Sequence, residues 1–119
     1  ARQADLALTP TSQTAEGTPG ETVIFTFTVT NLGNVTDTFT LEASGEWTAT
    51  LSVDTTGPLG AGESFTFTLT VAIPVSAADG TTDTASLVAR SSFDPGVTES
   101  AQAVTTAHTR KVFLPVIQR

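Results

Sequence analysis

The fold of this chain is decided by residues 20–34, which read GETVIFTFTVTNLGN. Between Val23 and Val29 the residues alternate strictly. Val23, Phe25, Phe27 and Val29 lie on one side, and Ile24, Thr26 and Thr28 lie on the other. A period of two predicts a β-strand with one strongly apolar face. The strand is bounded by Pro19-Gly20 and by Asn31-Leu32-Gly33-Asn34, which have turn chemistry.

The same design returns in residues 62–73, which read GESFTFTLTVAI. Phe65, Phe67, Leu69, Val71 and Ile73 form the apolar face of this second long strand, and Ser64 and three threonines form the other face. Two long strands with matching apolar faces indicate one core between two sheets.

The rest of the chain shows further short strands and no helical period. Strands are predicted at 5–11, 36–44, 47–53, 83–92, 97–109 and 112–117, and loops or turns at 12–20, 54–62, 75–82 and 93–96. Pro10 places the first of these strands at a sheet edge. In the 83–92 strand, Ala85, Leu87 and Ala89 are small enough to lie under the phenylalanines. The pattern predicts an all-β, immunoglobulin-like antiparallel β-sandwich of seven to nine strands. We expect one domain over residues 1–119, with a core at 5–107 and a tail strand at 108–119.

Composition excludes several functional classes. The chain has 119 residues, no cysteine and a net charge of −7, and residues 3–89 contain no Lys or Arg. Clustered cations are needed to bind phosphates, so the charge pattern argues against nucleic acid and anionic membranes as partners. A disulfide framework and a thiolate metal site are excluded by the missing cysteines. Only 14% of the residues are charged, and threonine takes their place, which is typical of exported β-rich proteins. We therefore expect an extracellular or cell-surface location.

Several local motifs resemble one group of bacterial domains. The motifs are Val29-Thr30-Asn31-Leu32-Gly33-Asn34, Asp37-Thr38-Phe39, Gly45-Glu46-Trp47, Ala61–Ser64 and Ile73-Pro74. Together they resemble bacterial extracellular Ig-like modules, the NEW3-like and alpha-galactosidase-associated surface-protein repeats, over about residues 5–107. The resemblance implies a spacer or accessory module of proteases, glycosidases, adhesins or surface layers. The C-terminal residues 112–119, VFLPVIQR, resemble the Leu-Pro-rich ends of secreted proteins of Chloroflexi type.

Candidate catalytic residues are sparse. His108 is the only histidine, and no serine stands in a nucleophile elbow. The carboxylate pairs Glu42/Glu46 and Asp79/Asp83 lack the aromatic platform of a sugar cleft. Asp79-Gly80-x-x-Asp83 could hold calcium, but a solvated turn fits its ligand density better. We expect no catalytic residue, no metal site and no cofactor.

Two further motifs have a structural and a functional interpretation. Trp47 could stack on a sugar ring, but its register with Ala49 and Leu51 favours core packing. Asn34-Val35-Thr36 matches an N-glycosylation acceptor, and turn chemistry is the simpler interpretation.

The C-terminal apolar run is the strongest candidate for a contact site. Val112, Phe113, Leu114, Pro115, Val116 and Ile117 are six apolar residues without alternation. Such a run needs cover on both faces, and Pro115 confines it to an edge. It is either the last strand of its own sandwich or a strand that docks on another copy or domain. The predicted self-association residues are these six together with Leu6 and Leu8 of the N-terminal edge strand.

The sequence thus predicts a non-catalytic structural module of an extracellular cell-surface protein or fibre. It would self-associate through its terminal strands, by β-strand addition or donor-strand complementation. Its partners would be other copies of itself or adjoining domains. The alternative is an accessory, spacer or weak carbohydrate-binding domain of a secreted hydrolase or protease, with a glycan as a possible partner.

Overall fold

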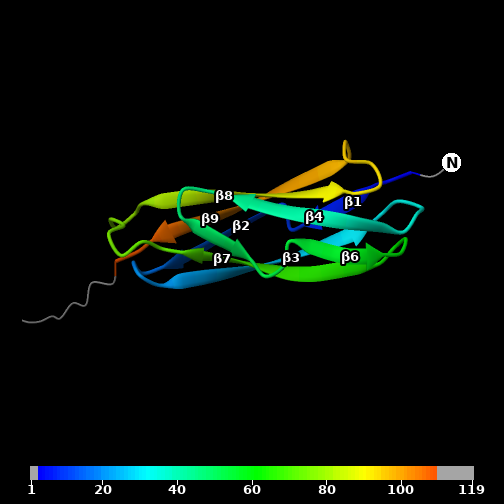
Figure 1. Cartoon of the computed structure of the whole chain (residues 1–119). Helices are drawn as coiled ribbons and strands as arrows, with labels where there is room; N and C mark the ends of the chain where they lie inside the picture. Colours follow the sequence, from blue (N-terminus) through cyan, green and yellow to red (C-terminus); the bar gives the residue numbers. More distant parts are fainter. Residues whose placement is uncertain (1–2, 110–119) are drawn as a thin grey trace, which may run out of the picture.

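The computed structural model describes residues 3–109, and these residues form nine β-strands and no helix (Figure 1). Because the described part contains no helix, it contains none that could cross a membrane. The strands are β1 (Leu6–Thr9), β2 (Ser12–Gly17), β3 (Thr22–Asn31), β4 (Asp37–Ser44), β5 (Thr48–Leu51), β6 (Thr55–Leu59), β7 (Ser64–Ala72), β8 (Thr82–Ser91) and β9 (Thr98–Ala107).

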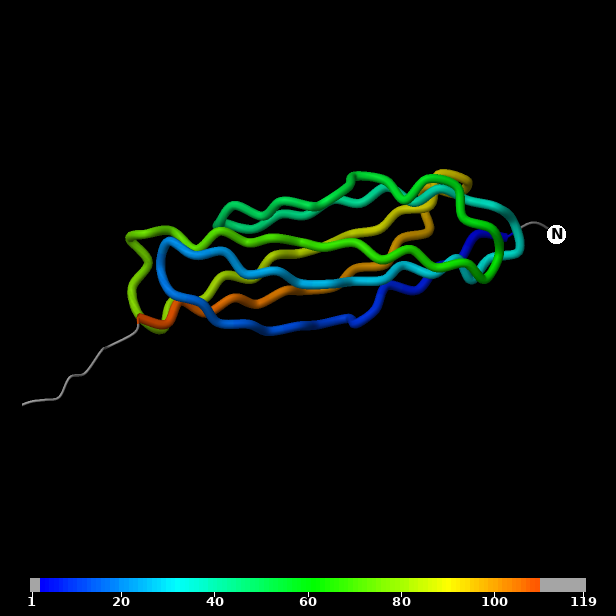
Figure 2. The backbone as a smooth tube through the Cα atoms, turned by 90° about the horizontal axis from the view of Figure 1, so that it is seen from below, coloured from blue at the N-terminus to red at the C-terminus, as the bar shows by residue number. Residues whose placement is uncertain are grey.

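The strands form two facing sheets. One sheet has four strands in the order β1-β3-β7-β5, and the other has five in the order β2-β9-β8-β4-β6. All pairings are antiparallel except that of β2 with β9. Figure 2 shows the long, narrow sandwich that results, with most strands running along its length. The predicted fold class is therefore confirmed, with the strand number at the upper end of the expected range.

The core is built around the pair of strands that the sequence singled out. β3 and β7 lie side by side, and Phe27 is directly opposite Phe67, with ring centroids 6.1 Å apart. Phe25, Phe27 and Phe67 are at most 2% exposed, whereas Ile24 on the other face is 65% exposed. Burying each phenylalanine contributes about 1.5–3 kcal/mol. The facing sheet supplies smaller buried side chains: Ala85, Leu87, Ala89, Ala101 and Ala103.

The N-terminal segment crosses from one sheet to the other. β1 pairs with β3, and after Thr9-Pro10, whose peptide bond is cis, β2 pairs in parallel with β9. The predicted edge position of the first strand is confirmed, since β1 ends its sheet. The prediction of a polar turn region over 12–20 was wrong for residues 12–17. These residues form β2, which presents mostly exposed polar side chains and is held through its backbone ladder, so it carries no apolar alternation.

The segment 54–62 also differs from its prediction as a loop. Residues 55–59 form β6, which pairs with the first half of β4. The proline and glycine of this segment are tolerated because β6 is an edge strand, which pairs on one side only. Pro58 lies opposite Thr38, Gly57 has a φ of 72°, and the register shifts between Thr38 and Thr40. Leu59 is the one core side chain of β6, at 7% exposed.

A buried asparagine ties the turn after β3 to the opposite sheet. Asn31 is 1% exposed, and its side-chain amide nitrogen donates to the carbonyl oxygens of Val35 and Leu59, each at 2.8 Å. Its Oδ1 accepts from the Gly33 N–H at 2.9 Å. The Gly33 N–H also donates to the Asp5 carbonyl, which holds the N-terminal segment against the turn. The motif Asn31-Leu32-Gly33-Asn34 thus joins three segments of the chain.

Candidate functional site

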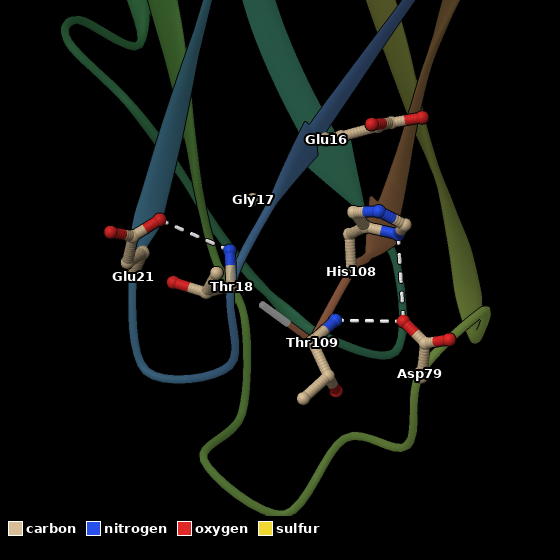
Figure 3. A pocket seen from close by; sticks show the side chains of 7 residues that line it. All are labelled: Glu16, Gly17, Thr18, Glu21, Asp79, His108 and Thr109. Carbon is tan, nitrogen blue, oxygen red and sulfur yellow. Dashed lines mark hydrogen bonds and ion pairs between the residues drawn. The ribbon is translucent and has the colours of Figure 1, made fainter. Parts of the chain in front are cut away.

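The described structure offers two surface depressions that merit attention as sites. The first is at the end of the sandwich where β9 ends, and it holds the only histidine (Figure 3). The second lies along one side, between β4 and β5. The histidine site contains the side chains best suited to chemistry, a histidine beside three carboxylates.

The depression at the β9 end has a volume of about 670 Å³ and is lined by Glu16, Gly17, Thr18, Glu21, Asp79, His108 and Thr109. His108 Nδ1 lies 3.5 Å from Asp79 Oδ1, and both side chains are more than half exposed. Asp79 Oδ1 also accepts from the Thr109 N–H at 2.7 Å, and Glu21 accepts from the Thr18 N–H at 3.0 Å (Figure 3). Two of the three carboxylates, those of Asp79 and Glu21, therefore accept hydrogen bonds from backbone N–H groups.

The described lining of this depression limits which catalytic groups the histidine can meet. No serine or cysteine lines the depression, so the His108–Asp79 contact has no serine or thiol nucleophile to activate. Among residues 3–109 no group of three or more histidine or acidic side chains has the geometry of a metal site. The contact is exposed, and an exposed ion pair of this kind contributes little.

The two aspartates of the possible calcium loop have separate roles. Asp79 is exposed and holds Thr109, whereas Asp83 is 8% exposed and accepts from the Glu46 N–H at 3.0 Å. Asp83 points inward on β8, so its carboxylate anchors the turn between β4 and β5. The structure therefore favours the turn interpretation over a shared cation.

The other candidate residues lie in the core packing or in turns. Trp47 is partly buried and packs against the core, as its register predicted. Asn34 Oδ1 accepts from the Gln3 N–H at 2.7 Å, which is turn chemistry. Glu42 and Glu46 are exposed on either side of the turn between β4 and β5.

Of the predicted self-association residues, Leu6 and Leu8 are described. They are 2% and 3% exposed and belong to the core of their own chain. A contact of β1 with another copy would therefore use its backbone edge, not these side chains. Val112, Phe113, Leu114, Pro115, Val116 and Ile117 lie outside the described residues, as does most of the predicted tail strand. His108 and Thr109 follow β9 without belonging to a strand.

The second depression is a groove between two unpaired strand edges. β6 pairs with β4 only from Asp37 to Thr40, and the Leu41 N–H bonds to the Asp54 carbonyl at 2.9 Å. Beyond Leu41 no described strand pairs with this edge of β4. β5 is the last strand of the other sheet and pairs only with β7. The chain leaves β4 through the turn at 45–47 and enters the opposite sheet, so the two edges face each other without hydrogen bonds between the strands.

The groove has an apolar floor and an acidic rim. Its volume is about 350 Å³, and it is lined by Leu41, Glu42, Ala43, Ser44, Ala49, Leu51 and Val88. Leu41 is buried, and Ala43, Ala49 and Leu51 are partly buried. A third depression of about 530 Å³ continues along residues 49–54. Glu42 lines the groove and Asp54 lines its continuation, and both residues are exposed.

Sequence reasoning did not find this groove. Its apolar residues are indistinguishable in the sequence from ordinary inward-facing strand residues. The only available signal was the short, breaker-rich segment after Val53, which limits how far β6 can cover β4.

No protein-family model and no curated protein matches this chain. Solved structures match it over most of its length. The PapD-like domain 7 of human CEP192 has 14% sequence identity and a TM-score of 0.68, with 90% of this chain and 87% of that chain covered. The chaperone DraB of E. coli has 13% identity and a TM-score of 0.63, with 92% and 57% covered. The secreted serine protease VesC of Vibrio cholerae has 18% identity and a TM-score of 0.57, with 88% and 23% covered.

The matches show an immunoglobulin-like, PapD-like β-sandwich. The chain spans just over half the length of DraB and about a quarter of VesC. At these identities the likeness concerns the fold alone.

Proposed function

We propose that this chain is a non-catalytic structural module of an extracellular cell-surface protein or fibre, and that it self-associates by strand addition. The observation that carries the proposal is the pair of unpaired strand edges at β4 and β5, which face each other over an apolar groove. An unpaired edge is a template for another strand unless it is protected. Neither strand contains the lysine or proline that commonly protects an edge.

Two further observations support the proposal. The one described histidine site lacks a serine or cysteine nucleophile, and the motifs quoted above resemble bacterial surface modules of NEW3-like type. The E. coli chaperone DraB shares the fold, which is compatible with a module that contacts other proteins. A surface location and assembly with copies of itself or with adjoining domains follow from this proposal.

The test is the assembly state of the full chain and of tail variants. We expect the full chain to form oligomers that sedimentation velocity resolves across a micromolar to millimolar concentration series. Deleting Lys111–Arg119 should abolish the oligomers, and so should Phe113→Glu with Leu114→Glu in the full-length chain. Circular dichroism should show the same β-spectrum for all three proteins, and their Tm should agree at concentrations too low for the full chain to assemble. A full chain that stays monomeric throughout, or a tail variant that assembles like the parent, refutes the proposal.

The likeness to a segment of a secreted protease favours one second candidate. Under it the chain is an accessory or spacer domain of a secreted hydrolase or protease, with weak carbohydrate binding. A glycan-array signal that Trp47→Ala removes, with the β-spectrum retained, would support this candidate. Absence of any glycan signal for the parent chain would count against its carbohydrate-binding form.

A further inference from the structure

We infer that the groove between β4 and β5 is the acceptor site for the C-terminal apolar segment, residues 112–117, of a second copy of this chain. This inference rests on the proposed function and specifies the two surfaces that would meet.

Charge separates the described body from the segments that flank it. Residues 3–109 contain all 12 acidic residues of the chain and a single base, Arg90. The apolar run 112–117 is flanked by Arg110 and Lys111 before it and by Arg119 after it. The chain therefore joins an apolar segment with basic ends to a domain whose charged residues are almost all acidic. Complementary charge guides association and fixes register.

The groove matches this segment in both properties. Leu41, Ala43, Ala49 and Leu51 supply apolar surface, and Glu42 and Asp54 supply the acidic rim. The depression around Asp79 also offers acidic charge, but no Ala, Val, Leu, Ile or Phe lines it. The groove and its continuation along residues 49–54 place aliphatic side chains beside acidic ones.

The two free edges also suit the backbone of the segment. A strand laid beside residues 42–44 of β4 would gain backbone hydrogen bonds there. In a strand that pairs along one side, alternate residues turn their N–H groups toward the partner. Pro115 has no N–H, and it can face away while residues 114 and 116 pair. The segment has apolar side chains on both of its faces, and the groove is walled by two strands, so both faces gain cover.

The chain length to the segment favours a second copy over the same chain. Ala107 ends β9, and an added strand beside Ser44 would lie beyond β8 and β4. Strand spacing and register place that position roughly 22 Å from Ala107. The five residues from Ala107 to Val112 span at most about 18 Å when fully extended. Val112 of the same chain therefore does not reach the start of the groove, whereas a second copy has no such limit.

Cysteine trapping tests the contact directly, because the chain has no native cysteine. The donors are full-length chains carrying Phe113→Cys or Leu114→Cys, so that one of two adjacent side chains faces the groove. The acceptor is a full-length, mass-tagged chain carrying Ala49→Cys in the groove. The matched control acceptor carries Thr26→Cys, an exposed position on the outer face of β3.

We expect a mixed disulfide between the Ala49→Cys acceptor and one donor to form at least about tenfold faster than with the control acceptor. Equal rates for the two acceptors would overturn the inference. Tail-dependent oligomers without any disulfide at Ala49 would overturn the inference and leave the proposed function standing. A full chain that never associates would overturn both. A chain carrying both Ala49→Cys and Leu114→Cys that closes on itself at high dilution would show own-chain docking and refute the second-copy assignment.

A second measurement tests the charge argument. Glu42→Gln with Asp54→Asn should raise the dissociation constant of the oligomer about three- to tenfold. The matched control is Glu16→Gln with Glu99→Gln, which removes two exposed acids elsewhere and should leave the dissociation constant unchanged. Equal effects of the two pairs would refute the role of the rim, because net charge alone would then explain the change.

Discussion

Replacing Asn31 by aspartate changes one atom of the side chain and tests the account of the turn after β3. In the native chain the amide nitrogen of Asn31 donates to two carbonyl oxygens at 2.8 Å, and Oδ1 accepts from the Gly33 N–H. Asn31→Asp keeps the acceptor and places a second carboxylate oxygen against two carbonyl oxygens. The side chain is 1% exposed, so the introduced charge would be buried without a cation.

The expected magnitude follows from the contacts. Asn31→Ala removes three side-chain hydrogen bonds, each of which contributes about 1 kcal/mol, so it should lower the free energy of unfolding by about 3 kcal/mol. Asn31→Asp loses two of these bonds, adds repulsion and buries a charge, so its cost should exceed that of alanine, at about 4 kcal/mol or more. For a domain of this size a loss of 3 kcal/mol lowers the Tm by roughly 12 °C.

The aspartate variant should also depend on pH in a defined direction. Burial and the two carbonyl oxygens disfavour the charged form, so the pKa of the introduced carboxyl is raised in the folded state above its unfolded value of about 3.9. The protonated carboxyl can donate to one carbonyl oxygen. The stability deficit relative to the parent should therefore be smallest below about pH 4 and grow as pH rises through the folded pKa.

The assay is urea unfolding of parent and variants at pH 4 and pH 8, followed by tryptophan fluorescence and circular dichroism. Asn34→Asp is the matched control, since Asn34 is exposed and uses its Oδ1 as an acceptor for the Gln3 N–H, which aspartate retains. It should change stability by less than about 0.5 kcal/mol. An Asn31→Asp protein as stable as the parent, or one whose deficit is the same at both pH values, would refute the hydrogen-bond account.

Two more predictions concern packing. Thr105 is 0% exposed, and its hydroxyl has no hydrogen-bond partner among the described residues. Thr105→Val should therefore raise the free energy of unfolding by about 1 kcal/mol. A lower Tm of the variant in thermal unfolding would contradict this prediction. At Gly33 an added Cβ would lie 2.4 Å from the Gln3 carbonyl oxygen. Gly33→Ala should therefore displace residues 3–5 at a cost of about 1–3 kcal/mol. The Leu32 amide, which donates to the Asp5 carbonyl oxygen, should then become exposed to hydrogen exchange, and a fully protected Leu32 amide would show that the turn accommodates the methyl group.

The sequence predicted the sandwich because its central strands bury one face and expose the other. Strict alternation through Phe25 and Phe27, repeated through Phe67 and Leu69, allows one arrangement of the apolar faces, and the structure confirms it. The edge position of the first strand followed equally directly from Pro10. These features depend on residues that are neighbours along the chain, so they can be predicted from a short stretch of sequence.

Two of the four edge strands, β2 and β6, escaped prediction for the opposite reason. β2 and β6 gain their stability from backbone ladders to β9 and β4, and a ladder leaves no signature in side chains. Their segments therefore read as polar or breaker-rich loops. The roles of Asp79 and Asp83 also depend on backbone contacts that the sequence does not show. The two residues are spaced like possible ligands of one cation, but Asp79 accepts from the Thr109 N–H and Asp83 accepts from the Glu46 N–H.

The sequence by itself determined the fold class, the core strands and the contrast between an acidic body and a basic, apolar C-terminal segment. Only the tertiary structure decided which strand edges stay unpaired. The edges of β4 and β5 lack a neighbour among the described strands because the chain changes sheets at 45–47 while β6 stops covering β4 after Thr40. Unpaired edges are a property of which strands become neighbours in space, and no single stretch of sequence specifies it.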